Sequence, residues 1–290
     1  LSLNYSYAIT IFLAVIATCF IARMFIILHD FSHGSFFSSR KAENIIGFIC
    51  GVVTLTPFKC WRKIHATHHA CSSNLDRRDI GDFLLYTVKE YLGLPKNEKI
   101  KYKFMRNPFT ILGLVPFVLF FILQRMPTTN IANFTQEEKD SVAWTNLALL
   151  AVIIVMGSVI GYKNFFLVQF PISMIVSTVG VWMFYIQHQF EDTYWAKKED
   201  LNYYLVSMKG SSYYKLPKIM QWFTGNTGYH HIHHLSPLIP NYKLQKCYDD
   251  NPIFQDVPTI TLRDSFKAFS LALWDEEKQK LVSFKSVENK

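Results

Sequence analysis

The ten histidines of this 290-residue chain are gathered in four places. Three of these places read HDFSH at residues 29–33, HATHH at 65–69 and HHIHH at 230–234, and His188 stands alone. On a helix, residues three and four positions apart share one face. The spacing therefore predicts three helical faces that each present several imidazole rings together: His29 with His33, His65 with His68 and His69, and His230 with His233 and His234.

This pattern indicates metal binding. Neutral imidazole is a common ligand for iron and zinc, and one zinc ion takes about four ligands. Nine rings, counting His188, are too many for one ion and suit two. His231 lies about 100° around the helix from His230 and is predicted not to be a ligand. Taken alone, His188 suits a structural role better, and a pH-sensing cluster would not need this repeated spacing.

Several acidic residues lie near the histidines in the sequence. Asp30 falls inside the first motif, Asp76 and Asp79 follow the second, and Glu191 and Asp192 follow His188. A carboxylate can accept the second ring N–H of a ligand histidine and so fix its orientation. The alternative for each is a solvated carboxylate or a helix cap. No Glu-x-x-His pair is present, which argues against the carboxylate-rich di-iron bundle.

The composition indicates that these motifs belong to a membrane protein. Half of the residues are hydrophobic and 18% are charged, against about 25% in a typical soluble domain. This excludes a disordered or collagenous chain, and five cysteines without a CxxC pair give no disulfide framework. The net charge of +8 lies in loops beside apolar runs, which is typical of a cytoplasmic positive bias and does not support nucleic-acid binding.

Apolar runs then predict how the histidines are positioned. Runs 8–28, 142–162 and 165–188 are long enough to span a bilayer, the last two as a hairpin, and buried helices of a soluble protein are the alternative. Runs 45–58 and 109–123 are short, so the first is predicted to be re-entrant or interfacial and the second interfacial. We expect one all-α domain over residues 1–290, with a cytoplasmic helical cap over 191–290 that completes the histidine-rich di-metal site. All the motifs then lie on one side of the membrane.

The three motifs, with the words HDFSHGSFF, HATHHACSSNLDRRDIGDF and GNTGYHHIHHLSPLIPNYKL, resemble those of the membrane fatty acid desaturases. The likeness is greatest to the bacterial acyl-lipid branch of Δ12/ω6 type, and it covers nearly the whole chain. It implies two iron ions held by histidines of the boxes and by one more, which His188 matches by position. It assigns no separate acid or base. One departure is Phe31-Ser32, where the family usually has Cys-Gly, so the position of the double bond is open.

The resemblance implies an integral multi-pass membrane enzyme, in the cell membrane if bacterial, with its site on the cytoplasmic side. Such an enzyme uses O2 to place a cis double bond in a lipid acyl chain, with electrons from a ferredoxin or cytochrome b5-like donor and its reductase. A hydroxylase of the same superfamily remains an alternative, and a metal transporter or zinc hydrolase a more distant one. Family members usually carry a further span before the first run, so we expect a truncated or processed N-terminus.

Overall fold

The computed structural model describes residues 2–78, 81–127 and 134–288. Three long helices dominate this part of the chain: α1 (Tyr7–His33), α7 (Gln136–Ile160) and α8 (Tyr162–His188). With 27 residues each, α1 and α8 are about 40 Å long, which exceeds the hydrocarbon thickness of a bilayer. All three helices are long and apolar enough to cross a membrane. The predicted all-α class with three candidate membrane helices is confirmed.

The side chains of these helices mostly face outward. In their most apolar stretches only 17%, 11% and 22% of the residues are buried inside the protein. Large apolar side chains such as Phe12, Trp144 and Val159 are more than half exposed. A continuous apolar surface of this size is unfavourable in water and is expected where a helix faces lipid.

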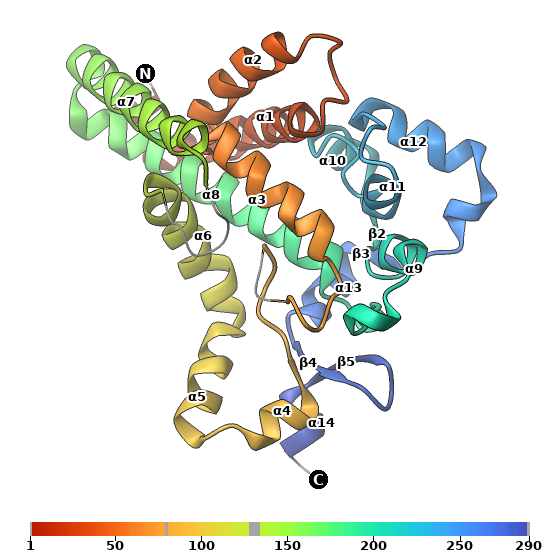
Figure 1. The fold of residues 1–290 in the computed structure, drawn as a ribbon. Coiled ribbons are helices and arrows are strands. Elements are labelled where there is room, and N and C mark those ends of the chain that lie inside the picture. Colours follow the sequence, from red (N-terminus) through yellow and green to blue (C-terminus); the bar gives the residue numbers. More distant parts are fainter. Residues whose placement is uncertain (1, 79–80, 128–133, 289–290) are drawn as a thin grey trace.

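The chain reverses direction between α7 and α8 (Figure 1). Gly161 alone joins Ile160 to Tyr162, and its φ of +85° lies in the left-handed region that favours glycine. At the start of α7, the backbone N–H of Thr135 donates to the carboxylate of Glu138 at 2.6 Å. This hydrogen bond belongs to a capping box at the N-terminus of α7, where side chains pair with backbone N–H groups that have no partner within the helix.

Two pairs of shorter helices lie beside the long ones. α2 (Arg40–Val53) meets α3 (Phe58–Cys71) at 96°, and α5 (Lys96–Met105) meets the helical segment Thr110–Arg125 at 57°. Each pair has the length and composition of a span only if it is counted as one broken helix. The re-entrant or interfacial placement of residues 45–58 and 109–123 therefore stays a prediction.

The bend between α2 and α3 directs the HATHH motif, which lies on α3. At the bend Leu55 has a φ of +57°, and the N–H of Thr56 donates to the carbonyl of Gly51 at 2.7 Å. A Cβ atom on Gly51 would lie only 2.3 Å from the carbonyl oxygen of Thr56. The close backbone approach at Gly51 therefore requires glycine.

Replacing Gly51 with alanine is expected to force the bend apart and to destabilise the protein by about 1–3 kcal/mol, the usual effect of overpacking. Thermal unfolding of the detergent-solubilised protein would measure this. Gly113→Ala is the matched control, because no heavy atom lies within 4 Å of the Cβ it would add. Equal melting temperatures for the two variants would contradict the close approach.

The cap after α8 contains a few short strands beside its helices. β2 (Tyr213–Lys215) pairs in parallel with β3 (Thr259–Thr261). β4 (Leu271–Asp275) pairs in parallel with β1 (Tyr86–Thr87) and antiparallel with β5 (Lys280–Ser283). Strands of two to five residues give too short a pattern to predict, and the fully buried β4 has no alternation that separates it from a helix.

The other elements are short and connect these parts: η1 (Ser2–Asn4), α4 (Val88–Gly93), the π-helical turns η2 (Thr110–Leu114) and η3 (Val118–Ile122) with α6 (Val115–Phe117) between them, η4 (Leu123–Arg125), η5 (Lys198–Asp200), α9 (Tyr203–Met208), α10 (Lys218–Phe223), α11 (His230–Leu235), α12 (Asn241–Asp250), η6 (Pro252–Gln255), α13 (Leu262–Ala268) and α14 (Phe284–Glu288).

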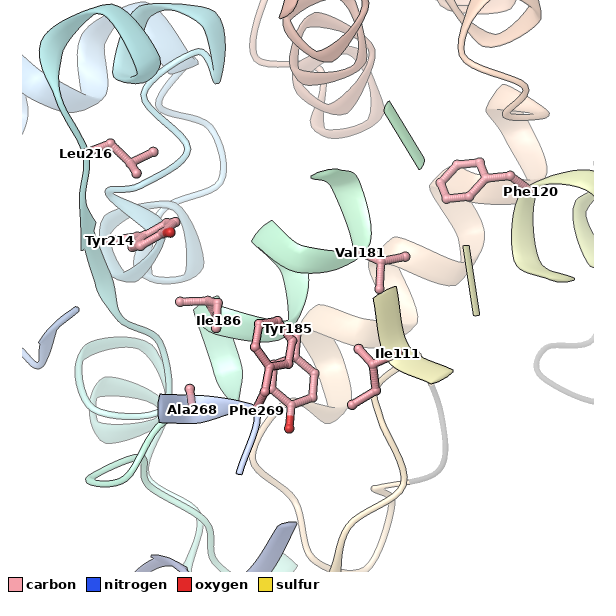
Figure 2. Packing of buried hydrophobic residues seen from close by; sticks show 9 residues of the cluster. All are labelled: Ile111, Phe120, Val181, Tyr185, Ile186, Tyr214, Leu216, Ala268 and Phe269. Atoms are coloured by element: carbon pink, nitrogen blue, oxygen red, sulfur yellow. The ribbon is translucent and has the colours of Figure 1, made fainter. Parts of the chain in front are cut away.

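A hydrophobic cluster of nine residues joins the C-terminal half of α8 to the cap (Figure 2). Val181, Tyr185 and Ile186 come from α8, and the ring of Tyr185 stacks on Phe269 with centroids 4.9 Å apart. Burial of aromatic and aliphatic groups on this scale contributes several kcal/mol. The cluster therefore holds the end of α8, where His188 lies.

Candidate metal centre

The elements bring nine of the ten histidines together. His29 and His33 lie in the last two turns of α1, which ends because Gly34 adopts a left-handed φ of +71°. α3 carries the second motif, α11 the third, and His188 is the last residue of α8. The helical spacing predicted for all three motifs is thus present. The rings that it presents are His29, His33, His65, His68, His69, His188, His230, His233 and His234.

The nine rings form two groups, each with its ligand atoms within 4.8 Å of one another. The five-histidine group draws on α1, α3 and α11, and the four-histidine group on α3, α8 and α11. α3 and α11 contribute to both groups, so the groups are adjacent. The members of the five-histidine group are His29, His33, His65, His69 and His233. Those of the four-histidine group are His68, His188, His230 and His234.

Within each group the rings meet through their Nε2 atoms. The Nε2 atom of His65 lies 2.9 Å from that of His33 and 3.1 Å from that of His69. The Nε2 atom of His230 lies 3.0 Å from both His188 and His234. One N–H can donate to only one of two such neighbours, so hydrogen bonds between the rings cannot satisfy the arrangement. A cation among the lone pairs would satisfy all of them.

The electrostatics of the rings also suit a metal ion. Burial and the neighbouring rings hold the pKa values of His230, His233 and His234 well below 6.5. Buried histidines are therefore kept neutral, and neutral imidazole is the form that binds a metal. A set of four nitrogen ligands beside a set of five fits two ions that favour imidazole, such as iron or zinc.

His188 is oriented by a backbone carbonyl. Its Nδ1 lies 3.2 Å from the carbonyl oxygen of Gly210, in the cap. With Nδ1–H donating there, the lone pair of Nε2 faces His68 at 3.2 Å and His230 at 3.0 Å. This assigns the ring tautomer that a ligand needs. No sequence pattern pointed to Gly210, which is 22 residues away from His188.

His231 belongs to neither group, as its helical position predicts. It is fully buried, and its Nε2 lies 3.1 Å from the carbonyl oxygen of Phe254. The ring packs edge-on to Tyr213 and Tyr248. Its contacts are those of a structural residue that joins α11 to β2, α12 and η6 within the cap.

Among the predicted acidic partners, Asp30 lies against a ligand candidate. Its Oδ1 is 3.5 Å from Nδ1 of His29, and its Oδ2 accepts hydrogen bonds from the N–H and the side-chain amide of Asn241 at 2.8 and 2.7 Å. Asn241 is the first residue of α12, and the positive end of a helix dipole stabilises a carboxylate there. Asp30 therefore ties the first motif to the cap.

The other acidic candidates have different partners in the described part of the chain. Asp76 accepts from the N–H of Lys198 at 2.9 Å, and Glu191 pairs with Lys267 and Lys280 at 2.7 and 3.2 Å. These contacts lie at the surface of the cap. No hydrogen bond or ion pair of Asp192 is present among the described residues, and Asp79 lies outside them.

Aromatic side chains border both groups. Trp61 stacks on His65 at 4.6 Å and 11°, and Phe184 packs against His68 at 5.1 Å. Such rings keep water from the histidines.

The residues Phe31 and Ser32, which stand where the resemblance implies Cys-Gly, lie within the first motif. Phe31 is buried in a cluster with Leu28 and its neighbours, and the hydroxyl of Ser32 donates to the carbonyl of His29 at 2.6 Å. Both residues support the last turns of α1.

A double histidine cluster at the ends of apolar helices defines a class of protein, the histidine-rich metal-binding membrane proteins. The model of the family described as "Fatty acid desaturase" matches residues 5–259. A fatty acid desaturase of Bacillus subtilis (strain 168) is 44% identical over 289 residues, which are 100% of this chain and 81% of that protein. The chain therefore belongs to the fatty acid desaturase family.

Two cyanobacterial relatives of Synechocystis sp. are more distant. The sn-1 acyl-lipid omega-3 desaturase (ferredoxin) is 26% identical and shares 80% of this chain and 68% of its own length. The sn-1 oleoyl-lipid 12-desaturase is 23% identical and shares 76% of this chain and 62% of its own length. The similarity thus extends across enzymes that differ in double-bond position.

Proposed function

We propose that the chain is an O2-dependent acyl-lipid desaturase that holds two iron ions in the nine-histidine cluster. The observation that carries the proposal is the division of the nine Nε2-bearing rings into adjacent groups of five and four. When bound, the irons would supply the oxidising power that an unactivated methylene requires. The balance is –CH2–CH2– + O2 + 2e⁻ + 2H⁺ → –CH=CH– + 2H2O.

The chain's own residues bind and orient in this reaction. The nine histidines hold the ions, and the carbonyl of Gly210 fixes the ring of His188. Asp30 lies 3.5 Å from Nδ1 of His29, and Trp61 and Phe184 exclude water from the site. Exclusion of water strengthens the electrostatic interactions within a site and prevents side reactions. The histidines lie at the ends of α1 and α8 rather than at their midpoints, which favours an enzyme at the membrane surface over a transporter.

The two electrons come from outside the chain in this proposal. The sequence holds no nucleotide-binding glycine motif, and one relative's name specifies ferredoxin. Residues 59–106 carry eleven Lys and Arg against five Asp and Glu, a balance that attracts an acidic donor such as ferredoxin or a cytochrome b5-like protein. The same bias favours the cytoplasmic side of a multi-pass membrane protein, the inner membrane in a bacterium.

The test is expression in a host that lacks polyunsaturated lipids, followed by mapping of the double bonds in its fatty acids by mass spectrometry. The expected product is two mass units lighter than its precursor, and the purified protein is expected to carry two irons. Turnover in lipid vesicles should stop when O2, carrier or reductase is omitted. A gain of sixteen mass units would identify a hydroxylase, and one zinc with anaerobic activity would refute the proposal.

Metal removal gives a second expected result. Chelation should abolish turnover. Loading the metal-free protein with Fe²⁺ under anaerobic conditions should restore turnover once O2 is supplied, because the histidine groups are formed by packed helices. The helices that carry the histidines, α1, α3, α8 and α11, are expected to stay folded after chelation. The circular dichroism spectrum of the protein should therefore keep its helical signal. Loss of helix content on chelation would show instead that the metal builds the fold.

A further inference from the structure

We propose that Arg106 is a positioning residue that couples the C-terminal hairpin β4–β5 to the four-histidine group through the last turn of α8. The inference rests on the proposed function in one respect, that this group binds a metal ion. It concerns a residue and a segment that lie outside the histidine motifs, and the hairpin also follows the residues matched by the family model.

Arg106 is buried, with 4% of its surface exposed, at the end of α5. Its Nη2 donates to the hydroxyl of Tyr185 at 3.1 Å, to Oε1 of Gln189 at 2.9 Å and to the carbonyl of Leu271 at 3.1 Å. Its Nη1 donates to the carbonyl of Leu84 at 3.4 Å. Among the described residues, no carboxylate lies within 4 Å of the guanidinium group. The buried carboxylate of Asp82 attracts the guanidinium group electrostatically but forms no ion pair with it within 4 Å. A buried charge without a direct ion-pair partner is costly, so its retention calls for a role.

Two of these partners flank His188. Tyr185 is one turn before it and Gln189 follows it, and both are fully buried. The N–H of Gln189 donates to the carbonyl of Tyr185 at 2.8 Å, which closes the last turn of α8. Tyr185 also stacks on Phe269, as Figure 2 shows. Arg106 therefore holds the helix turn that sets where the ring of His188 lies.

The third partner belongs to the hairpin. Leu271 opens β4, and its carbonyl accepts from both Arg106 and the hydroxyl of Tyr185, the latter at 3.2 Å. The hydroxyl of Tyr102 on α5 donates to the next carbonyl along β4, that of Ala272, at 2.6 Å. The planar fork of an arginine can reach several acceptors at once, which a lysine cannot. One side chain thus joins α5, the end of α8 and β4.

The geometry of His188 makes this coupling matter for the metal. Its ring is held at Nδ1 by Gly210 and presents Nε2 to His68 and His230. Misplacing a supporting group of a ligand histidine typically costs 10–100-fold in metal affinity. The five-histidine group does not include His188, so a fault in this turn should affect one ion more than the other.

The experiment compares Arg106→Lys, Arg106→Gln and Tyr185→Phe with the control Lys103→Ala. Lys103 lies on the same helix and pairs with Glu288 at the surface. Co²⁺ is the probe, titrated into the metal-free full chain in detergent, since its absorbance reports histidine ligation without turnover. Melting temperature and circular dichroism are recorded for the same metal-free samples.

The expected result is a roughly 10–100-fold weaker binding of one Co²⁺ in both Arg106 variants, with the other site unchanged. Tyr185→Phe keeps the ring and removes one acceptor, so a smaller loss at the same site is expected, and Lys103→Ala should match the wild type. Equal weakening of both sites in step with the melting temperature would overturn the proposal, because that is the result of a merely structural role. Unchanged Co²⁺ binding in Arg106 variants that fold would also overturn the proposal. If neither Arg106 variant folds, unchanged Co²⁺ binding in Tyr185→Phe would overturn it.

These outcomes separate the inference from the proposed function. The proposed function would be refuted if the wild-type chain binds two Co²⁺ but does not desaturate lipid when it is supplied with iron, O2 and an electron donor. The variants would then still decide the role of Arg106. A wild-type chain that binds no Co²⁺ at the four-histidine group would overturn the inference directly.

Discussion

His68→Ala is expected to abolish desaturation and to remove one of the two metal ions, whereas His231→Ala is expected to keep both ions and measurable activity. His68 is buried in the four-histidine group, with its Nε2 3.2 Å from that of His188. Loss of a supporting residue typically costs 10–100-fold in affinity, and loss of a ligand itself costs more. Activity should therefore fall by more than about 100-fold.

His231 is a suitable control for His68, because it follows the ligand candidate His230 in the sequence and is as deeply buried as His68. Its ring bonds to the carbonyl of Phe254 and contacts no other histidine group. Truncation leaves that carbonyl without its partner and costs about 1–3 kcal/mol of stability. The variant should melt a few degrees lower and still turn over at moderate temperature.

The measurements are metal content per purified chain and double bonds formed in host lipids. Both variants are assayed well below their melting temperatures. Full loss of metal and activity in His231→Ala would contradict the division into nine ligands and one structural histidine. Full retention in His68→Ala would contradict the four-histidine group.

Spacing alone predicted much of the site because the signal is local. Each histidine motif fits within one or two helical turns, and the helices place its rings on one face. The same argument separated His231 from its neighbours. Long apolar runs predicted α1, α7 and α8 for a similar reason, since each is continuous in sequence.

The parts that could not be predicted depend on contacts between distant residues. The sequence does not show that His68 and His69, adjacent in the chain, enter different groups, because this depends on how α8 and α11 dock. It does not show that Asp30 meets Asn241, 211 residues away. Nor does it show that Glu191, next to the site in sequence, turns outward to lysines. Acidic neighbours in sequence were thus a weak guide to acidic neighbours in space.

Asp30→Ala is expected to have the second largest effect, on both stability and metal binding. The carboxylate is buried and accepts two hydrogen bonds from Asn241 at 2.8 and 2.7 Å. Alanine leaves the N–H and the amide of Asn241 without an acceptor, at about 1–3 kcal/mol for each. Because the bond joins α1 to α12, the cap should loosen from the first motif.

The loss should also be visible at the five-histidine group. Asp30 lies 3.5 Å from Nδ1 of His29, so its removal takes away the carboxylate beside that ring, and one metal ion should bind about 10–100-fold more weakly. Asp30→Asn keeps one acceptor oxygen and should fall between wild type and alanine. Asp76→Ala is the control, because that carboxylate is exposed and bonds only to the N–H of Lys198 among the described residues.

Thermal unfolding and metal titration of these three variants distinguish two roles of Asp30. If the carboxylate both fastens the cap and orients His29, Asp30→Ala loses melting temperature and affinity at one site, and Asp76→Ala loses neither. If it only fastens the cap, both sites weaken together as the cap loosens, since α11 contributes rings to each group. Selective weakening of the four-histidine group would contradict both roles, because His29 belongs to the other group and Asp30 bonds to α12, which contributes no histidine to either group.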